Sequence, residues 1–321
     1  MTRDDESGDG RSVQPGLAAS NEEYDEKKLR GSRFRSIIAP YLYVAPAFVV
    51  FAAFLGWQLV QTAEYSLFDW DGLGASTFVG LSNYLETFQD PEIRSSFIHA
   101  LVLTLFYAGI PVIVALILTV LISRSSKMKV MSFYRTVLFL PQVISSVVVA
   151  TIWVSMYSQN GFINQILNAF HLGGLTHAWL GDYSTALIAI GVVGTWTNMG
   201  LCLVLFLSGV GNIEPELFEA VRLDGANKWQ EFFAITLPEL RGQISVALTL
   251  TVISAFKTFD LVFVTTRGGP GNSTSVPAWE AYNRAFNTGQ VGLASAVAVV
   301  LTVLIVIITW AIGRIDAKET A

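Results

Sequence analysis

The sequence predicts an all-α, polytopic membrane protein. Hydrophobic residues make up 52% of the 321 residues and charged residues 14%, whereas soluble domains carry about 25% charged residues. Six stretches are apolar over the length of about 20 residues that a helix needs to cross a bilayer. They lie at 41–66, 98–122, 134–156, 185–208, 244–265 and 291–313. A polar segment between the fourth and fifth stretches, 213–240, has the pattern of a short helix pair outside the bilayer.

The first 36 residues differ in kind from the rest of the chain. Acidic residues alternate there with Gly, Ser and Arg, and no apolar residue recurs with a helical period. Such a composition buries too little surface to fold, so we expect a disordered tail over 1–36. The tail is too long and acidic for a signal peptide, so the first span should stay as an anchor. The membrane domain is then expected at 37–315, with a short end at 316–321.

The second and sixth predicted spans contain long uncharged stretches. Residues 101–122 contain no charged side chain, and neither do residues 291–313. A core helix of a soluble protein seldom runs so far without one, so a membrane setting is favoured. Pro111 and Pro141 lie inside the second and third spans, and we expect each to kink its helix.

Lys and Arg are distributed unequally between the two sets of connections. One set holds Lys27, Lys28, Arg30, Arg33, Arg35, Arg124, Lys127, Lys129, Arg135, Arg222, Lys228, Arg241, Arg314 and Lys318. The opposite set holds Arg94, Arg267 and Arg284. Because cytoplasmic loops carry the excess of Lys and Arg, both termini and the segment 213–240 are predicted to face the cytoplasm.

The segment 213–240 begins with a short amphipathic helix. Pro215 suits the first turn, where its missing N–H costs nothing. Leu217, Ala220 and Val221 then repeat at i, i+3 and i+4 and form one apolar face. Gly225 follows Asp and reaches positive φ without steric penalty, so it is expected to end this helix.

A second short helix is predicted directly after that turn. Trp229, Phe232 and Phe233 lie on one of its faces, and Pro238 is expected to end it, because proline cannot continue a helix hydrogen-bond pattern. Two short helices, aromatic on one side, would thus project from a membrane protein on a short connection.

Several kinds of chemistry have no signature in this sequence. There is no G-x-x-x-x-G-K-[ST] phosphate loop, so we expect no nucleotide hydrolysis by this chain. His99, His171 and His177 lack a second ligand at i+3 or i+4, and we expect no metal site. Neither a nucleophile–base set nor a T-V-G-Y-G channel filter occurs, and no nucleic acid partner is expected. Any energy source would lie on another chain.

The segment after the fourth span resembles the signature of permease subunits in binding-protein-dependent ABC importers. That signature is Glu-Ala-Ala, three residues, Gly, nine residues, Ile, one residue, Leu-Pro. This chain has Glu219, Ala220, Val221, Gly225, Ile235, Leu237 and Pro238 in the same register. Val221 departs from it, as one small apolar residue replacing another.

Further stretches are similar to the carbohydrate branch of that family. They are Phe-Val-Gly-Leu-Ser-Asn-Tyr at 78–84, Phe-Tyr-Arg-Thr-Val-Leu-Phe-Leu-Pro at 133–141, Phe-Lys-Thr-Phe-Asp at 256–260 and Gly-Gly-Pro at 268–270. The resemblance covers about residues 40–315. It is nearest to the first (F/A-type) permease of lactose, multiple-sugar and glycerol-3-phosphate systems.

The resemblance implies a multi-subunit importer in the bacterial inner membrane, in contact with lipid. A second permease would complete the pathway, two ATPase subunits would bind ATP and Mg, and an extracytoplasmic binding protein would deliver substrate. This chain would hold no cofactor. The helix around Glu219 would insert into an ATPase cleft, so that the spans rock between two states. The residues that this implies for coupling are Glu219, Ala220, Val221, Arg222, Asp224, Gly225, Ile235, Leu237 and Pro238.

Side chains suited to a sugar pathway lie in the third, fourth and fifth spans. The candidates are Trp153, Tyr157, Trp196, Asn198, Lys257 and Asp260. The last two are at i, i+3 and are predicted to share one helix face. Ionisable side chains inside a membrane usually face the interior of the bundle. Each candidate has an alternative role. Lys257 could extend its ammonium group to the membrane surface, with Asp260 as partner, and the tryptophans could serve only in packing or at the membrane interface. Asn198 could form a hydrogen bond with a neighbouring helix instead of with substrate.

The sequence thus predicts a permease that carries a sugar or sugar derivative. A phosphorylated or glycerophospho substrate is the nearest alternative, although Lys257 is the one basic residue offered by the later spans. A non-transporting membrane receptor would not need the Gly225 turn. A secondary transporter should show internal repeats, and none is evident.

Overall fold

The computed structural model describes residues 40–123 and 128–319. The predicted tail at 1–36 therefore lies outside the described residues. The chain divides into two units after Gln61. The first unit consists, where described, of most of a helix that runs from Pro40 to Tyr65. This helix contains a π-helical turn, η1 (Ala52–Gly56), followed by α2 (Trp57–Tyr65). It corresponds to the first predicted span.

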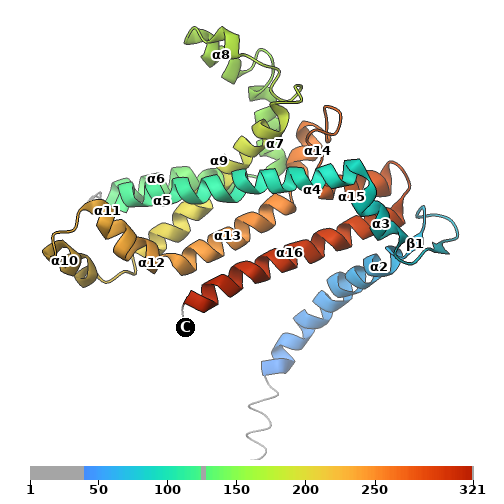
Figure 1. Ribbon diagram of the computed structural model, residues 1–321, viewed down its shortest axis with the longest axis horizontal. Coiled ribbons are helices and arrows are strands. Elements are labelled where there is room, and N and C mark those ends of the chain that lie inside the picture. The colour runs from blue at the N-terminus through green and yellow to red at the C-terminus, as the bar shows by residue number, and fades with distance from the viewer. Residues whose placement is uncertain (1–39, 124–127, 320–321) are drawn as a thin grey trace, which may run out of the picture. The chain divides into compact units, whose positions relative to one another are not determined.

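Long helices lying side by side form the body of the second unit (Figure 1). They are α4 (Pro91–Thr104), which continues through η2 (Leu105–Gly109) into α5 (Ile110–Ser123), then α9 (Ala186–Val210), α13 (Arg241–Phe256) and α16 (Val291–Glu319). Helix α9 packs against α5 and α13, and α13 packs against α16. These helices correspond to the second, fourth, fifth and sixth predicted spans.

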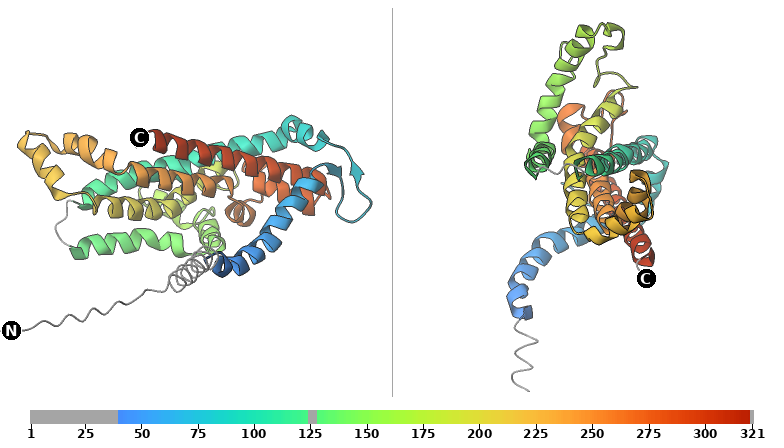
Figure 2. Two further views of the ribbon diagram at one scale, coloured as in Figure 1. Left: turned by 90° about the horizontal axis from the view of Figure 1, so that it is seen from below. Right: turned by 90° about the vertical axis from the view of Figure 1, so that its left-hand side faces the viewer.

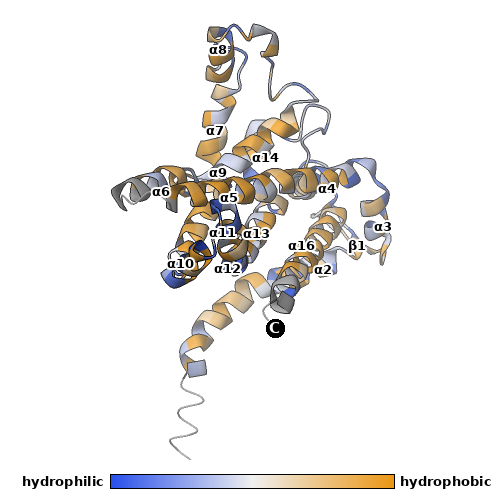
Figure 3. Cartoon of the chain, turned by 60° about the vertical axis from the view of Figure 1, so that its left-hand side comes forward, coloured by the Kyte–Doolittle hydropathy of each residue, from blue (hydrophilic) through white to orange (hydrophobic). Residues whose placement is uncertain are grey.

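Shorter elements connect the long helices at both ends. One end carries a two-stranded antiparallel sheet of β1 (Phe68–Asp69) and β2 (Thr77–Phe78), with α3 (Ser82–Gln89) and α15 (Pro277–Phe286). The other end carries α10 (Pro215–Leu223), α11 (Lys228–Glu231), η4 (Phe232–Thr236) and α12 (Leu237–Glu239). Figure 3 shows hydrophilic residues gathered on α10 and α11, whereas the long helices are largely hydrophobic.

The third predicted span is not one straight helix. It consists of α6 (Met128–Val143) and α7 (Ser146–Met156), and the two parts are bent by 96°. The bend falls after Val143 rather than at Pro141, because Ser145 adopts an extended conformation with ψ 136°. The described chain therefore has five helices long and apolar enough to span a membrane, or six if the bent pair counts as one span. After α7 come α8 (Phe162–Ala169) and η3 (Gly173–Leu175).

The fifth span is also broken, and this corrects a prediction. Helix α13 ends at Phe256, and α14 (Asp260–Thr265) begins four residues later. Lys257 and Asp260 therefore lie on either side of a break and do not share one helix face. The break was not evident from composition because apolar residues continue on both sides of it. Within it, the Thr258 hydroxyl donates to the Ser254 carbonyl oxygen at 2.9 Å, at the end of α13.

Proline at 238 does not end the second short helix of the 213–240 segment, contrary to expectation. The helical run continues to Glu239, and a π-helical turn, η4, immediately precedes it. The same arrangement occurs in the second span, where η2 ends two residues before Pro111. A proline ring crowds the carbonyl four residues earlier, and that carbonyl lies inside the π turn in both cases. The wider turn lets the helix continue.

Glycines on α9 allow its neighbours to approach closely. A Cβ at Gly194 would overlap the Tyr107 ring, and one at Gly200 would overlap the Leu138 carbonyl oxygen of α6. Small residues at such contacts are the usual means of packing helices in a membrane. Close contact at Gly194 places Tyr107 beside the middle of α9, where the candidate site lies.

Candidate functional site

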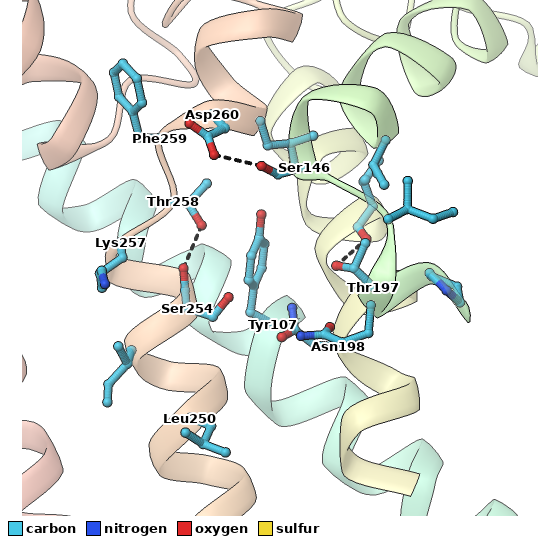
Figure 4. A pocket seen from close by; sticks show the side chains of 17 residues that line it. Tyr107, Ser146, Thr197, Asn198, Leu250, Ser254, Lys257, Thr258, Phe259 and Asp260 are labelled. Atoms are coloured by element: carbon cyan, nitrogen blue, oxygen red, sulfur yellow. Dashed lines mark hydrogen bonds between the residues drawn. The ribbon is translucent and has the colours of Figure 1, made fainter. Parts of the chain in front are cut away.

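A polar cavity of about 490 Å³ lies among the breaks of the third and fifth spans (Figure 4). Its walls come from η2, the end of α6, the start of α7, the middle of α9, and the α13–α14 break. Polar side chains contribute much of this wall. They are Tyr107, Gln142, Ser146, Thr197, Asn198, Ser254, Lys257, Thr258 and Asp260. A cavity lined by hydroxyl, amide and charged groups in such apolar helices suits a hydrated or polar ligand.

A hydrogen bond joins the two broken spans at this cavity. The Ser146 hydroxyl, at the start of α7, donates to Asp260 Oδ2, at the start of α14, over 2.7 Å. Asp260 therefore has a partner from another span. No ion pair joins it to Lys257, although both residues are described and exposed to the cavity. The cavity thus holds one basic and one acidic side chain that are not neutralised by each other.

Asn198 and Tyr107 are two further polar groups of this wall. Asn198 is buried, and its side-chain amide donates to the Gly194 carbonyl oxygen at 2.9 Å. Figure 4 shows the Tyr107 ring standing in the cavity, with its hydroxyl directed toward the space between Thr258 and Ser146. Tyr107 thus supplies an aromatic hydroxyl to this site, and Asn198 of α9 supplies one of its amides.

The three aromatic candidates lie together, but not at this cavity. The rings of Trp153 and Tyr157 are 5.1 Å apart between centroids, and those of Trp153 and Trp196 are 5.7 Å apart. The Tyr157 hydroxyl donates to the Ala189 carbonyl oxygen at 3.1 Å. Trp196 lines a separate groove of about 300 Å³ with apolar walls. Of the six candidates, Asn198, Lys257 and Asp260 line the polar cavity.

Sequence reasoning missed most of the hydroxyl groups of this wall. Tyr107, Ser146, Thr197 and Thr258 are common residues whose side chains have no unusual spacing. One signal was available: Ser146 and Thr258 are polar residues at points where apolar spans are interrupted. A search for polar residues next to helix breaks would have found those two, provided that the breaks themselves had been predicted.

The helix pair at the other end is tightly defined by local hydrogen bonds. Gly225 has φ +81°, its N–H donates to the Arg222 carbonyl oxygen at 3.0 Å, and the Ala226 N–H donates to the Val221 carbonyl oxygen at 3.2 Å. This is a Schellman motif, which ends a helix through a residue in the left-handed conformation. The predicted helix end at Asp224–Gly225 is therefore confirmed.

Helix α11 starts in an equally specific way. The Asn227 side chain accepts from the N–H groups of Trp229 and Gln230, both at 3.0 Å, and the Gln230 side chain accepts from the Asn227 N–H at 2.7 Å. This reciprocal capping box satisfies otherwise unpaired donors at the helix start. The turn between α10 and α11 is thus fixed from both sides.

A two-pronged ion pair connects the two short helices. Arg222 Nε lies 3.1 Å from Glu231 Oε2, and Arg222 Nη2 lies 3.0 Å from Glu231 Oε1. The hydrogen bond and charge of Glu231 raise the pKa of Arg222. Paired N–H donors of arginine match both oxygens of a carboxylate, so this contact also restricts the angle between the helices.

The nine residues predicted for coupling divide into an exposed and a covered set. Glu219 and Ala220 are exposed on α10, whereas Ile235 is buried. Large apolar side chains are exposed on the same helix pair. They are Leu217, Leu223, Trp229 and Phe233. An exposed apolar surface beside a free carboxylate is suited to contact with another protein.

An ion-pair cluster lies at the opposite end of the unit. Arg284 of α15 is 2.6 Å from Asp90, at the start of α4, and 3.6 Å from the buried Glu280. Burial raises the pKa of Asp90, but the N–H groups of Glu92 and Ile93 and the Arg284 guanidinium together lower it below its usual value. The cluster joins α15 to the start of the second span.

Fold and site together define a polytopic α-helical membrane protein with a polar cavity among its spans and an exposed helix pair at one end. Residues 112–320 match the family described as binding-protein-dependent transport system inner membrane component. The probable ABC transporter permease YurN of Bacillus subtilis is 38% identical over 287 residues, covering 88% of this chain and 95% of that protein. The chain belongs to this family of ABC transporter permeases, which are non-catalytic membrane components.

Other relatives and solved structures agree with this assignment. The multiple sugar-binding transport system permease MsmF of Streptococcus mutans is 32% identical, covering 80% of this chain and 87% of that one. A bacterial alginate ABC transporter, in complex with its alginate pentasaccharide-bound periplasmic protein, has a TM-score of 0.77 at 19% identity. That match covers 90% of this chain and 97% of the other, and it shows the fold. The predictions of an all-α polytopic protein and of an ABC permease are confirmed.

Proposed function

We propose that this chain translocates a sugar or sugar derivative in an ATP-driven importer. The cavity carries the proposal, because its wall offers hydroxyl and amide groups with one acidic and one basic side chain. Such a wall matches the hydroxyl groups of a neutral carbohydrate. A phosphorylated substrate would call for more positive charge than Lys257 supplies.

The names of relatives support a carbohydrate substrate. They include permeases for multiple sugars, for starch degradation products and for diacetylchitobiose. The solved alginate importer handles an acidic polysaccharide. These proteins differ in the sugar that they carry, and an uptake assay with several substrates distinguishes among such sugars for this chain.

The proposed importer contains four kinds of subunit. A second permease would complete the pathway, two ATPase subunits would bind ATP and Mg, and a binding protein would deliver the sugar from outside. Both termini of this chain and α10 would face the cytoplasm, as the distribution of Lys and Arg favours.

Coupling in this proposal runs through α10. Glu219 is exposed and would pair with a basic residue of an ATPase cleft, while Ala220 would allow close approach. Because the Gly225 turn and the Arg222–Glu231 pair hold α10 and α11 together, they would move as one body. Closure of the ATPases on ATP would then rock the attached spans and open the cavity to the outside.

Uptake by the complete transporter in proteoliposomes tests this function. The probes are radiolabelled maltotriose, N,N′-diacetylchitobiose and glycerophosphocholine, each with and without ATP and the binding protein. We expect ATP- and binding-protein-dependent uptake of a neutral oligosaccharide. Uptake restricted to glycerophosphocholine would overturn the sugar assignment, and uptake without ATP would overturn the importer assignment.

A matched pair of variants links that uptake to the cavity. Thr258→Val removes a cavity hydroxyl at nearly constant volume and should lower uptake several-fold. Thr302→Val is the control, because Thr302 makes the same i−4 hydrogen bond on the exposed side of α16, away from the cavity. Equal effects of the two changes would contradict a role for Thr258 in the pathway.

A further inference from the structure

A cavity of about 780 Å³ lies between the short helix pair and the ends of two long helices. Side chains of α10, α11 and η4 form one part of its wall, and Val120 of α5 and Val210 of α9 form another. Figures 1 and 2 show the helix pair at the end of the bundle where α5 and α9 end. The cavity therefore lies where two predicted spans leave the bilayer.

This cavity is separate from the surface of the helix pair that is suited to contact with another protein. That surface consists of the Glu219 carboxylate and four exposed apolar side chains, namely Leu217, Leu223, Trp229 and Phe233. None of these five residues lines the cavity. A ligand in the cavity would thus leave the other surface free for a protein partner.

The charged side chains of the cavity wall are two cations and one anion, namely Arg222, Lys228 and Glu231. Glu231 is paired with Arg222 through Nε and Nη2 of the guanidinium, which leaves the N–H groups of Arg222 Nη1 available as donors. Lys228 is exposed and forms no ion pair with any residue that the structure describes. Such a wall balances one negative charge, which is the charge of a phosphodiester.

A largely buried threonine in the same wall has a hydroxyl without a partner. Thr236 is 8% exposed, and its hydroxyl forms no hydrogen bond within the described part of the chain. A helical threonine can donate to the carbonyl four residues earlier, as Thr251 does to Ala247 at 2.7 Å. Thr236 ends the π turn η4, where the Phe232 carbonyl accepts from the Leu237 N–H instead. An unpaired hydroxyl is costly, so Thr236 indicates a ligand that carries acceptor oxygens.

The remaining wall is apolar and adjoins an exposed apolar stripe on α5. The apolar lining includes Val120, Val210, Phe218 and Phe232. Next to Val120, the side chains of Ile113, Ile117 and Leu121 repeat at i, i+4 and i+8 and are 59%, 53% and 60% exposed. Because no charged residue occurs over 101–122, this stripe is suited to acyl chains. A soluble anion would gain little from such a wall, whereas an amphipathic ligand matches both parts of it.

We infer that this cavity binds the head group of an anionic glycerophospholipid from the cytoplasmic leaflet, with its acyl chains along α5. The phosphodiester would accept from Lys228, from Arg222 Nη1 and from the Thr236 hydroxyl. Basic pockets between spans on the cytoplasmic side are suited to anionic head groups. The inference goes beyond the proposed function and rests on it in one respect, namely that the helix pair faces the cytoplasm.

Native mass spectrometry of the assembled transporter tests the inference. The delipidated complex is titrated with phosphatidylglycerol, with phosphatidylcholine of the same acyl chains, and with glycerol 1-phosphate. The cavity variants are Lys228→Gln and Thr236→Val. The control is Arg314→Gln, because Arg314 is an exposed cation near the end of α16 that lies over the Trp310 ring and does not line the cavity. Other subunits also meet lipid, so the measure is the difference between variant and wild type.

We expect Lys228→Gln to weaken phosphatidylglycerol binding about five-fold, as for one basic residue at a membrane surface. Thr236→Val should weaken it as well, whereas Arg314→Gln should not. An equal loss in Arg314→Gln would indicate general attraction to the surface and overturn the inference, as would unchanged binding in both cavity variants. Equal affinity for phosphatidylcholine would overturn the anionic assignment, and equal affinity for glycerol 1-phosphate would show a site for soluble anions. Sugar uptake is measured separately, so a failure of the lipid site leaves the proposed function standing, and a failure of uptake leaves the lipid measurement intact.

Discussion

Replacing Gly225 by valine should uncouple ATP hydrolysis from transport. Gly225 has φ +81°, and no atom lies within 4 Å of the position that a Cβ would occupy. The cost of a side chain there is therefore backbone strain and not a clash with neighbours. For an L-residue in the left-handed region this strain is about 1–2 kcal/mol, and a β-branched residue lies at the upper end. Such an energy shifts an equilibrium by about 5–30-fold.

The strain falls on the joint between α10 and α11. Relief requires Gly225 to leave positive φ, which breaks the Schellman hydrogen bonds and changes the direction of α11 relative to α10. We expect wild-type binding of substrate, with fewer substrate molecules transported per ATP or weaker recovery of the ATPases. The assay measures uptake and phosphate release in the same proteoliposomes.

Two controls separate coupling from general instability. Gly289→Val introduces comparable strain at φ +67°, also in open space, between α15 and α16. It should leave the ratio of uptake to ATP hydrolysis unchanged. Gly225→Asn should behave almost like the wild type, because asparagine tolerates the left-handed region. Normal coupling in Gly225→Val, or an equal defect in Gly289→Val, would refute the reasoning.

Three further predictions concern the cavity and the opposite end of the unit. Gly194→Ala should displace the Tyr107 ring from the cavity wall and lower uptake while the ATPases remain bound; unchanged uptake would contradict the close contact. Lys257→Met should raise KM or lower the transport rate if Lys257 meets substrate, and unchanged kinetics would favour snorkelling. Asp90→Asn weakens the contact with Arg284 and should destabilise the protein at pH 7 by about 1–2 kcal/mol, as judged by thermal unfolding. The pKa of Asp90 is lowered in the fold, so the ionised carboxylate stabilises the folded protein above about pH 4, and this stabilisation is lost as pH falls further. The stability of Asp90→Asn should therefore fall less than that of the wild type on acidification.

Much of the fold could be predicted from the sequence because its causes are local. Apolar stretches of sufficient length predicted the helices, and the observed bounds of α9 differ from the prediction by one or two residues. The end of α10 was predicted as well, since the left-handed conformation at Gly225 is a property of glycine itself. The family followed from the spacing of residues between Glu219 and Pro238, which is also local.

The candidate site was decided by tertiary structure. Asn198, Lys257 and Asp260 line the polar cavity, whereas Trp153 packs against Tyr157 and Trp196; their place in a substrate pathway stays a prediction. Whether an aromatic ring faces a cavity or another ring depends on which helices are adjacent, and no single span contains that information.

The sequence alone determined that this protein is a helical membrane permease with an exposed helix pair, because hydropathy and turn chemistry act over a few residues. Tertiary structure decided where two spans break, how Ser146 meets Asp260 across 114 positions of the chain, and why Tyr107 stands in the cavity. Those features depend on close packing at Gly194 and on contacts between distant segments.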